Sequence, residues 1–130
     1  MDNLASTPCV ITWDKGRRGL NFADCEIAWT SFKSPSRIFE FRWNGMLQGD
    51  MKEKETRIHP TQKPVALYEW LLRHYAKQGD KILDTHVGSG SSRIACEKLG
   101  FDFVGYEIDE TYFNLQEERY KNAIWTIPLL

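Results

Sequence analysis

Hydrophobic and polar positions divide the chain into segments with two different periods. Residues 9–14 form an apolar stretch typical of a buried strand, residues 26–32 alternate in part, and residues 37–43 alternate clearly. Residues 44–58 have no period and contain glycine and mixed charge, which predicts a loop. The first part of the chain is therefore expected to be rich in β-structure.

A helical period begins after Pro64, which fits the start of a helix because its missing N–H is not needed there. Gly79 is expected to end this helix as a C-terminal glycine cap. The apolar side chains that fall on one face at helical spacing are Val65, Tyr68, Leu71, Leu72 and Tyr75.

The remaining residues alternate between strands and helices. The pattern predicts strands at residues 81–84 and 101–107, a helix at residues 91–99 that Gly100 closes, and a last helix over about 110–123 that follows an acidic cap, Asp109. This order predicts an α/β fold with a parallel strand–helix–strand unit and a right-handed crossover.

Composition restricts the class of protein. The 42% of hydrophobic and 27% of charged residues fit a globular domain with a core, and the net charge of −1 does not by itself point to a polyanion partner. Three cysteines far apart predict free thiols in a reducing compartment, without a metal site. No apolar run approaches the roughly 18 residues of a membrane helix, so no membrane partner is expected.

The candidate chemistry lies where the two predicted parallel strands end. Asp84 ends the first strand, Gly88 and Gly90 form a turn, and Ser91 begins a helix whose free N–H groups favour negative charge. Glu107 ends the next strand, where a carboxylate suits the hydroxyls of a ribose. A nucleoside-cofactor pocket is predicted, although the third glycine of the dinucleotide fingerprint and the Gly-Lys-Ser/Thr of a phosphate loop are absent.

A second motif carries a family resemblance. His59-Pro-Thr-Gln-Lys-Pro64 precedes Asp84-Thr-His-Val-Gly-Ser-Gly90, and together they resemble the S-adenosylmethionine-binding pair of the permuted (beta-class) amino-group DNA methyltransferases. Residues 13–16, 21–29 and 42–45 also look like phage-type adenine methylases. The resemblance implies an incomplete Rossmann-like methyltransferase sheet with flanking helices, S-adenosylmethionine as the cofactor, and methyl transfer to adenine N6 in double-stranded DNA.

The same resemblance implies a set of cofactor-binding residues. The turn would cradle the methionine end of the cofactor, Glu107 would hold the ribose, and Ile108 would lie beside the adenine. Thr85-His86 stands where the family usually has Pro-Phe, which makes that contact more polar. The implied residues are His59, Thr61, Gln62, Lys63, Asp84, Thr85, Gly88, Ser89, Gly90, Ser91, Glu107 and Ile108.

The catalytic segment of that family, Asp/Asn/Ser-Pro-Pro-aromatic, is absent because no two of the five prolines are adjacent. In the permuted order it would precede residue 1, so the chain is expected to be a C-terminal portion without catalytic residues of its own. A truncated gene, one half of a split enzyme and a remnant stay open. The functional alternatives are a non-catalytic cofactor- or DNA-binding module, cytosine N4 methylation, and a nicotinamide-binding domain, against which residues 59–64 argue.

Positive charge gathers where the family places target recognition. Residues 33–63 contain seven Lys/Arg against four acidic residues. We interpret Trp43 as a core residue rather than a base-stacking one. The candidate DNA-binding residues are Lys33, Arg37, Arg42, Lys52, Lys54 and Arg57.

The expected organisation is a single partial methyltransferase domain over residues 1–130. Residues 33–58 would form a target-recognition loop and residues 59–123 the cofactor-binding units. Missing central strands would leave parallel strand edges unpaired, which predicts a homo-oligomer or completion by a separate N-terminal methyltransferase chain. The apolar tail, residues 124–130, is interpreted as a further strand or a docked segment, and the expected location is the cytoplasm of a bacterial or phage-infected cell.

Overall fold

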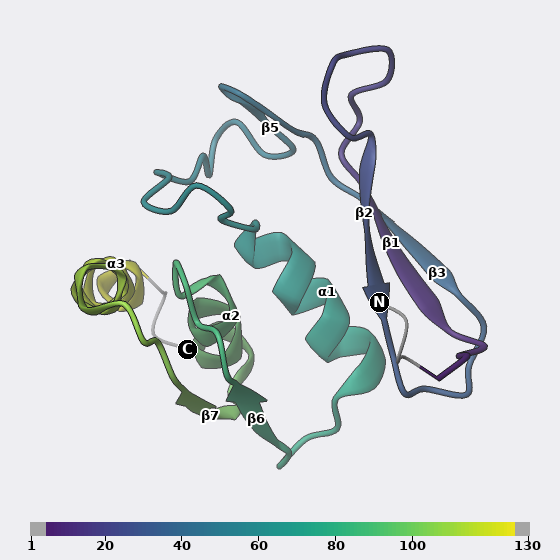
Figure 1. The fold of residues 1–130 in the computed structure, drawn as a ribbon. Coiled ribbons are helices and arrows are strands. Elements are labelled where there is room, and N and C mark those ends of the chain that lie inside the picture. Colours follow the sequence, from purple (N-terminus) through teal and green to yellow (C-terminus); the bar gives the residue numbers. More distant parts are fainter. Residues whose placement is uncertain (1–4, 127–130) are drawn as a thin grey trace. The chain divides into compact units, whose positions relative to one another are not determined.

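A computed structural model describes residues 5–126 and divides the chain into two compact units, Met1–Lys54 and Glu55–Leu130 (Figure 1). Each unit contains both secondary structure and buried apolar side chains. The single-domain organisation predicted from the sequence stays a prediction.

The first unit is built on a three-stranded sheet. The central strand β1 (Val10–Asp14) pairs antiparallel with β2 (Cys25–Trp29) and parallel with β3 (Arg37–Glu40). Ile11 and Trp13 of β1 are buried on one face of this sheet, as the alternation of the sequence predicts. The strands end earlier than expected, at Trp29 and Glu40 rather than at residues 32 and 43.

The opposite face of this sheet is apolar and exposed. Thr12 of β1 stands in register with Ile27 of β2 and with Ile38 of β3. Both isoleucines and the neighbouring Trp29 are exposed. An exposed apolar face of this kind is a candidate contact surface.

The prediction of a loop over residues 44–58 is wrong for its first part. Strand β4 (Trp43–Asn44) pairs antiparallel with β5 (Leu47–Gln48), and Gly45 allows the tight reversal because its φ is +55°. Only 4% of Trp43 is exposed, and its ring centroid lies 6.3 Å from that of Trp13. The interpretation of Trp43 as a core residue is confirmed.

The second unit has the predicted strand–helix order. Helix α1 (Val65–Tyr75) is followed by β6 (Lys81–Asp84), α2 (Ser91–Leu99), β7 (Asp102–Gly105) and α3 (Glu110–Trp125). Strands β6 and β7 pair in parallel, and α2 packs against both α1 and α3 (Figure 1). The core cluster consists of Val65, Leu72, Ile94, Ala95 and Cys96.

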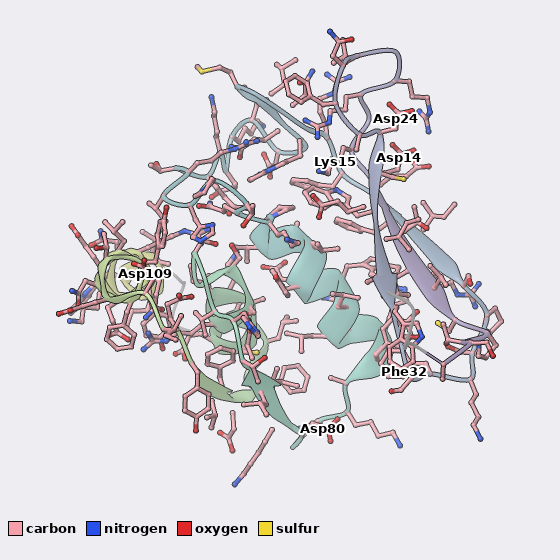
Figure 2. The ribbon with its side chains drawn as sticks, in the orientation of Figure 1. Asp14, Lys15, Asp24, Phe32, Asp80 and Asp109 are labelled. Atoms are coloured by element: carbon pink, nitrogen blue, oxygen red, sulfur yellow. The ribbon has the colours of Figure 1, made fainter. Side chains whose placement is uncertain are left out.

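The helix ends follow the predicted caps with one exception. Gly100 ends α2 with φ of +76°, and Asp109, labelled in Figure 2, accepts the Tyr112 N–H at 2.9 Å to cap α3. The assignment of Gly79 as the cap of α1 is wrong, because the Ala76 N–H already closes the last turn on the Leu72 carbonyl at 3.0 Å. Gly79 instead occupies the short turn that leads into β6.

The expectation for the apolar tail is also corrected in part. Residues 124 and 125 continue α3 and do not form a strand, because the helical hydrogen bonding of α3 extends to Trp125. Residues 127–130 lie outside the described part of the chain.

Candidate functional site

The glycine turn between β6 and α2 is fastened to the end of β7. Gly88 and Gly90 have φ of +56° and +81°, conformations that favour glycine. The Val87 N–H donates to the Tyr106 carbonyl at 3.0 Å, and the Gly90 N–H donates to the Val87 carbonyl at 3.0 Å. The turn is therefore a defined backbone cradle at the carboxyl edge of two parallel strands.

The Asp84 carboxylate stabilises this cradle through two hydrogen bonds. One carboxylate oxygen, Oδ1, accepts the His86 N–H at 2.9 Å, and the other, Oδ2, accepts the Ser92 hydroxyl at 2.5 Å. The side chain at the end of β6 therefore organises both the entry to the turn and the first residues of α2.

Glu107 joins the second strand to the same turn. Its Oε2 accepts the Gly88 N–H at 2.8 Å, and its Oε1 accepts the Asp109 N–H at 3.0 Å. These two bonds, with the Asp109 bond the stronger influence, lower the pKa of Glu107, so the carboxylate is charged at neutral pH. Each carboxylate oxygen has a further lone pair and can accept a hydroxyl from a ligand.

The segment before α1 reaches the same place. The His59 ring lies 3.9 Å from the position that a Cβ on Gly88 would occupy, and its centroid is 4.2 Å from that of Tyr112 on α3. Thr61 contacts the His59 Nδ1 through its hydroxyl at 3.1 Å. The two motifs that the sequence singled out therefore meet at Gly88.

The other predicted residues of this segment have interior partners. Gln62 is buried, donates to the Thr56 carbonyl at 3.2 Å and accepts the Ile58 N–H at 2.9 Å, so it shapes the loop. The Lys63 carbonyl accepts the Ser91 hydroxyl at 2.6 Å, which ties the segment to α2.

The polar side chains of the turn divide between interior and surface. Ser89 and Ser91 are buried, and their hydroxyl oxygens lie 3.2 Å apart inside the protein. Thr85 and His86 are exposed, and the Thr85 hydroxyl is hydrogen-bonded to the His86 Nδ1 at 2.8 Å. Ile108 is 102% exposed, an unusual state for a large apolar side chain beside a cradle of this kind.

Sequence reasoning missed the part that α3 plays. Tyr112 packs on His59, Gln116 is buried against Gly90, and Arg119 donates to the Ser89 carbonyl at 2.8 Å. The signal was present, because these three residues recur at helical spacing on one face of a helix that follows the site. Glu55, which pairs with Arg119, carried no such signal.

The candidate DNA-binding residues are all exposed. Five lie in the first unit, and Arg57 lies in the second. Arg42 lines a hollow together with Arg18, Asp14 and Glu40, so charge of both signs meets there. Figure 2 shows Asp14, Lys15 and Asp24 at one end of the first unit, where the Lys15 N–H donates to the Asp24 carbonyl at 3.0 Å.

Residues 5–126 contain no group of three or more His, Cys, Asp or Glu side chains that could hold a metal ion. None of their helices combines the length and the apolar character that crossing a membrane requires.

Comparisons with known proteins agree with this geometry. Residues 13–118 match the N6/N4 family described as DNA methylase. The chain is 35% identical over 86 residues to the type II methyltransferase M.HpaI of Haemophilus parainfluenzae, covering 66% of this chain and 26% of that protein. It is 38% identical over 77 residues to the type II methyltransferase M2.DpnII of Streptococcus pneumoniae, covering 59% of this chain and 28% of that protein.

Solved structures are similar as well. The crystal structure of an M1.HpyAVI–SAM complex matches with a TM-score of 0.57 and 26% identity over 85% of this chain and 60% of that chain. The fold also matches a complex of TTHA0409 from Thermus thermophilus with S-adenosyl-L-methionine, with a TM-score of 0.56 and 19% identity over 93% of this chain and 54% of that chain. The chain thus spans about a quarter of the length of the type II methyltransferases, at 26% and 28%. On the family match over residues 13–118, the chain belongs to the DNA methylase family.

Proposed function

We propose that this chain supplies the cofactor-binding part of an S-adenosylmethionine-dependent DNA methyltransferase that acts on adenine N6 in double-stranded DNA. The observation that carries the proposal is the meeting of Glu107, the Gly88 turn and His59 at one edge of the β6–β7 pair. Two strand ends and a preceding loop create a cradle there, and a nucleoside cofactor bound in it would contact all three.

The residues present fit this cofactor. The charged Glu107 carboxylate can accept both hydroxyls of a ribose, and the exposed Ile108 offers an apolar surface to an adenine ring. The free N–H groups of the first turn of α2 favour a carboxylate, as does the positive charge of Lys63. When bound, S-adenosylmethionine supplies a methyl group activated on a sulfonium; the residues of this chain would bind and orient it.

Calorimetry on the 130-residue chain tests the cofactor assignment. We expect binding of S-adenosylmethionine or its demethylated product and no binding of NAD. Glu107→Ala should weaken binding by about 1–3 kcal/mol because the ribose loses a charged acceptor. Glu110→Ala, an exposed carboxylate at the start of α3, is the matched control and should bind like the parent. Binding of NAD alone would contradict the assignment.

We also propose that the 130-residue chain by itself transfers no methyl group to DNA, because it contains no Pro-Pro-aromatic segment to hold a flipped base. Radiolabelled methyl incorporation above a no-protein control would contradict this. A chain that supplies the segment should restore transfer, and nucleoside analysis of the product then separates adenine N6 from cytosine N4 methylation. The alternative, a binding module without catalysis, predicts binding of cofactor or DNA and no restored methyl transfer when such a chain is added.

DNA would contact the exposed cations Lys33, Arg37, Arg42, Lys52, Lys54 and Arg57. Phosphate contacts by such residues give binding that depends on salt and little on sequence. We further propose a homo-oligomer or a complementing N-terminal chain as the assembled form, in the cytoplasm of a bacterial or phage-infected cell. The free thiols Cys9, Cys25 and Cys96 are compatible with that compartment.

A further inference from the structure

A largely buried ion pair connects the elements that form the cradle. Arg119 of α3 donates through Nη2 to the Glu55 carboxylate at 2.6 Å, and the two side chains are only 13% and 16% exposed. Through Nη1, Arg119 donates to the Ser89 carbonyl at 2.8 Å and to the Ser91 hydroxyl at 2.9 Å. One guanidinium therefore holds the glycine turn, the first residue of α2 and Glu55 together.

Glu55 extends the connection to the His59 segment. Its second oxygen, Oε2, accepts the Val65 N–H at 2.9 Å at the start of α1, directly after that segment. The Ser91 hydroxyl, which accepts from Arg119, itself donates to the Lys63 carbonyl at 2.6 Å. The pair thus bonds to both walls of the cradle and does not depend on contact with a ligand.

Stability alone does not account for this pair. Burial raises the pKa of Glu55 and lowers the pKa of Arg119 in spite of their mutual attraction, so each charged form is disfavoured by its surroundings. A largely buried ion pair of that kind is weak evidence for stabilisation. What it does provide is charge-assisted bonds with fixed direction, from Arg119 to the Ser89 carbonyl and the Ser91 hydroxyl and from the Val65 N–H to Glu55.

We infer that Arg119 and Glu55 are positioning residues that set the turn of residues 88–90 against the His59 segment and thereby determine cofactor affinity. The inference rests on the proposed cofactor site. Arg119 acts through the Ser89 carbonyl and Ser91, and Glu55 acts through Arg119 and the start of α1.

The chain offers a matched control. Tyr120 of α3 donates to the Glu97 carboxylate of α2 at 2.9 Å. Like Arg119, Tyr120 ties α3 to a neighbouring element through a bond to a carboxylate, but this bond lies near the C-terminal end of α2 and not on the backbone of the turn. Loss of this bond should therefore lower stability without moving the turn.

The test compares Arg119→Lys and Glu55→Gln with the control variants Tyr120→Phe and Glu97→Gln in the 130-residue chain. Three quantities are measured: the urea midpoint, the amide hydrogen exchange of residues 86–92 without ligand, and the dissociation constant for S-adenosylmethionine. We expect Arg119→Lys to weaken cofactor binding about tenfold and to speed exchange in the turn, since one charged bond is lost there. The control pair should change only the urea midpoint.

If Arg119→Lys does not fold, the near-isosteric variant Glu55→Gln tests the positioning role of the pair. Unchanged turn exchange and unchanged affinity in the folded Glu55 and Arg119 variants, with a lowered urea midpoint, would overturn the positioning role. If the parent chain binds no S-adenosylmethionine, the proposed function fails, and the exchange measurement still decides whether the pair holds the turn. Equal acceleration of exchange in the Tyr120 and Glu97 control variants would also overturn the inference.

Discussion

The charged side chains of the proposed cofactor site differ in exposure and bonding from the candidate DNA-binding cations. In residues 55–130, Asp84, Glu107 and Arg119 each form short hydrogen bonds to the backbone or hydroxyls of one turn. In the first unit, candidate cations such as Lys52 and Lys54 are exposed. The cofactor site therefore has the fixed directions that recognition of one small ligand requires, and the exposed cations carry charge that can adapt to a repetitive polyanion.

This difference implies two kinds of sensitivity. Ligand binding by the second unit should depend on sub-ångström geometry, so that a single methyl group or a lost hydrogen bond has a large effect. Binding of DNA by the first unit should depend on the number of positive charges and on salt. The following predictions, from the largest expected effect to the smallest, test that division.

The largest effect is expected on assembly. Within residues 5–126, β6 pairs with β7 alone, and Leu83 and Val104 are exposed on the same two strands. An unpaired edge beside an apolar surface favours association. Light scattering after size-exclusion chromatography should give at least twice the 15.2 kDa of the monomer.

Val104→Lys should shift the chain towards monomer, whereas Asn114→Lys, on exposed α3, adds the same charge elsewhere and should not. A parent chain that unfolds cooperatively as a monomer near 15.2 kDa would show that association is not needed.

The next effect is expected at Gly90. A Cβ there would lie 3.2 Å from Gln116, and the φ of +81° is strained for alanine. Gly90→Ala should lower the free energy of unfolding by about 1–2 kcal/mol and weaken cofactor binding more than tenfold, since the turn must shift. Gly100→Ala has a similar φ of +76° and open space around it, so it should lose comparable stability with unchanged affinity. Equal affinities in the two variants would contradict a geometry-limited site.

A smaller effect is expected for DNA binding. Removing two phosphate contacts with Lys52→Ala and Lys54→Ala should make the slope of log K against log salt shallower by about 2. Titration of duplex DNA at several salt concentrations measures this slope. Gly90→Ala serves as the cross-control, because it damages the turn of the second unit and should leave the slope unchanged. An unchanged slope of log K against log salt in this variant would mean that Lys52 and Lys54 do not contact DNA phosphates.

The smallest effect concerns pH. The folded-state pKa of Glu107 lies below its ordinary value of 4.5, so its stabilising contribution is complete above that pH and is lost as the pH falls through the folded-state pKa. The urea midpoint of the parent chain should therefore fall between about pH 5 and pH 3, and more steeply than that of Glu107→Gln. Parallel curves for parent and Glu107→Gln would mean that the carboxylate does not hold the turn.

Local sequence patterns located most features of the second unit. The strand at residues 81–84, the Gly100 and Asp109 caps, and the turn between Gly88 and Gly90 all follow from signals within a few residues of each other. The family motifs at residues 59–64 and 84–90 likewise required no structure to locate. The predicted strand at 101–107 was too long, because element ends depend on pairing partners.

Only the tertiary structure decided which side chains organise the site. Glu55 and Arg119 are 64 positions apart, and nothing between them marks them as partners. The structure likewise determined that Ser89 and Ser91 face the interior. It also determined the β4–β5 hairpin, for which the aperiodic segment gave no signal. Periodicity reports which face of an element is buried, but a hydrogen bond between distant residues depends on the packing of several elements at once, which no local pattern encodes.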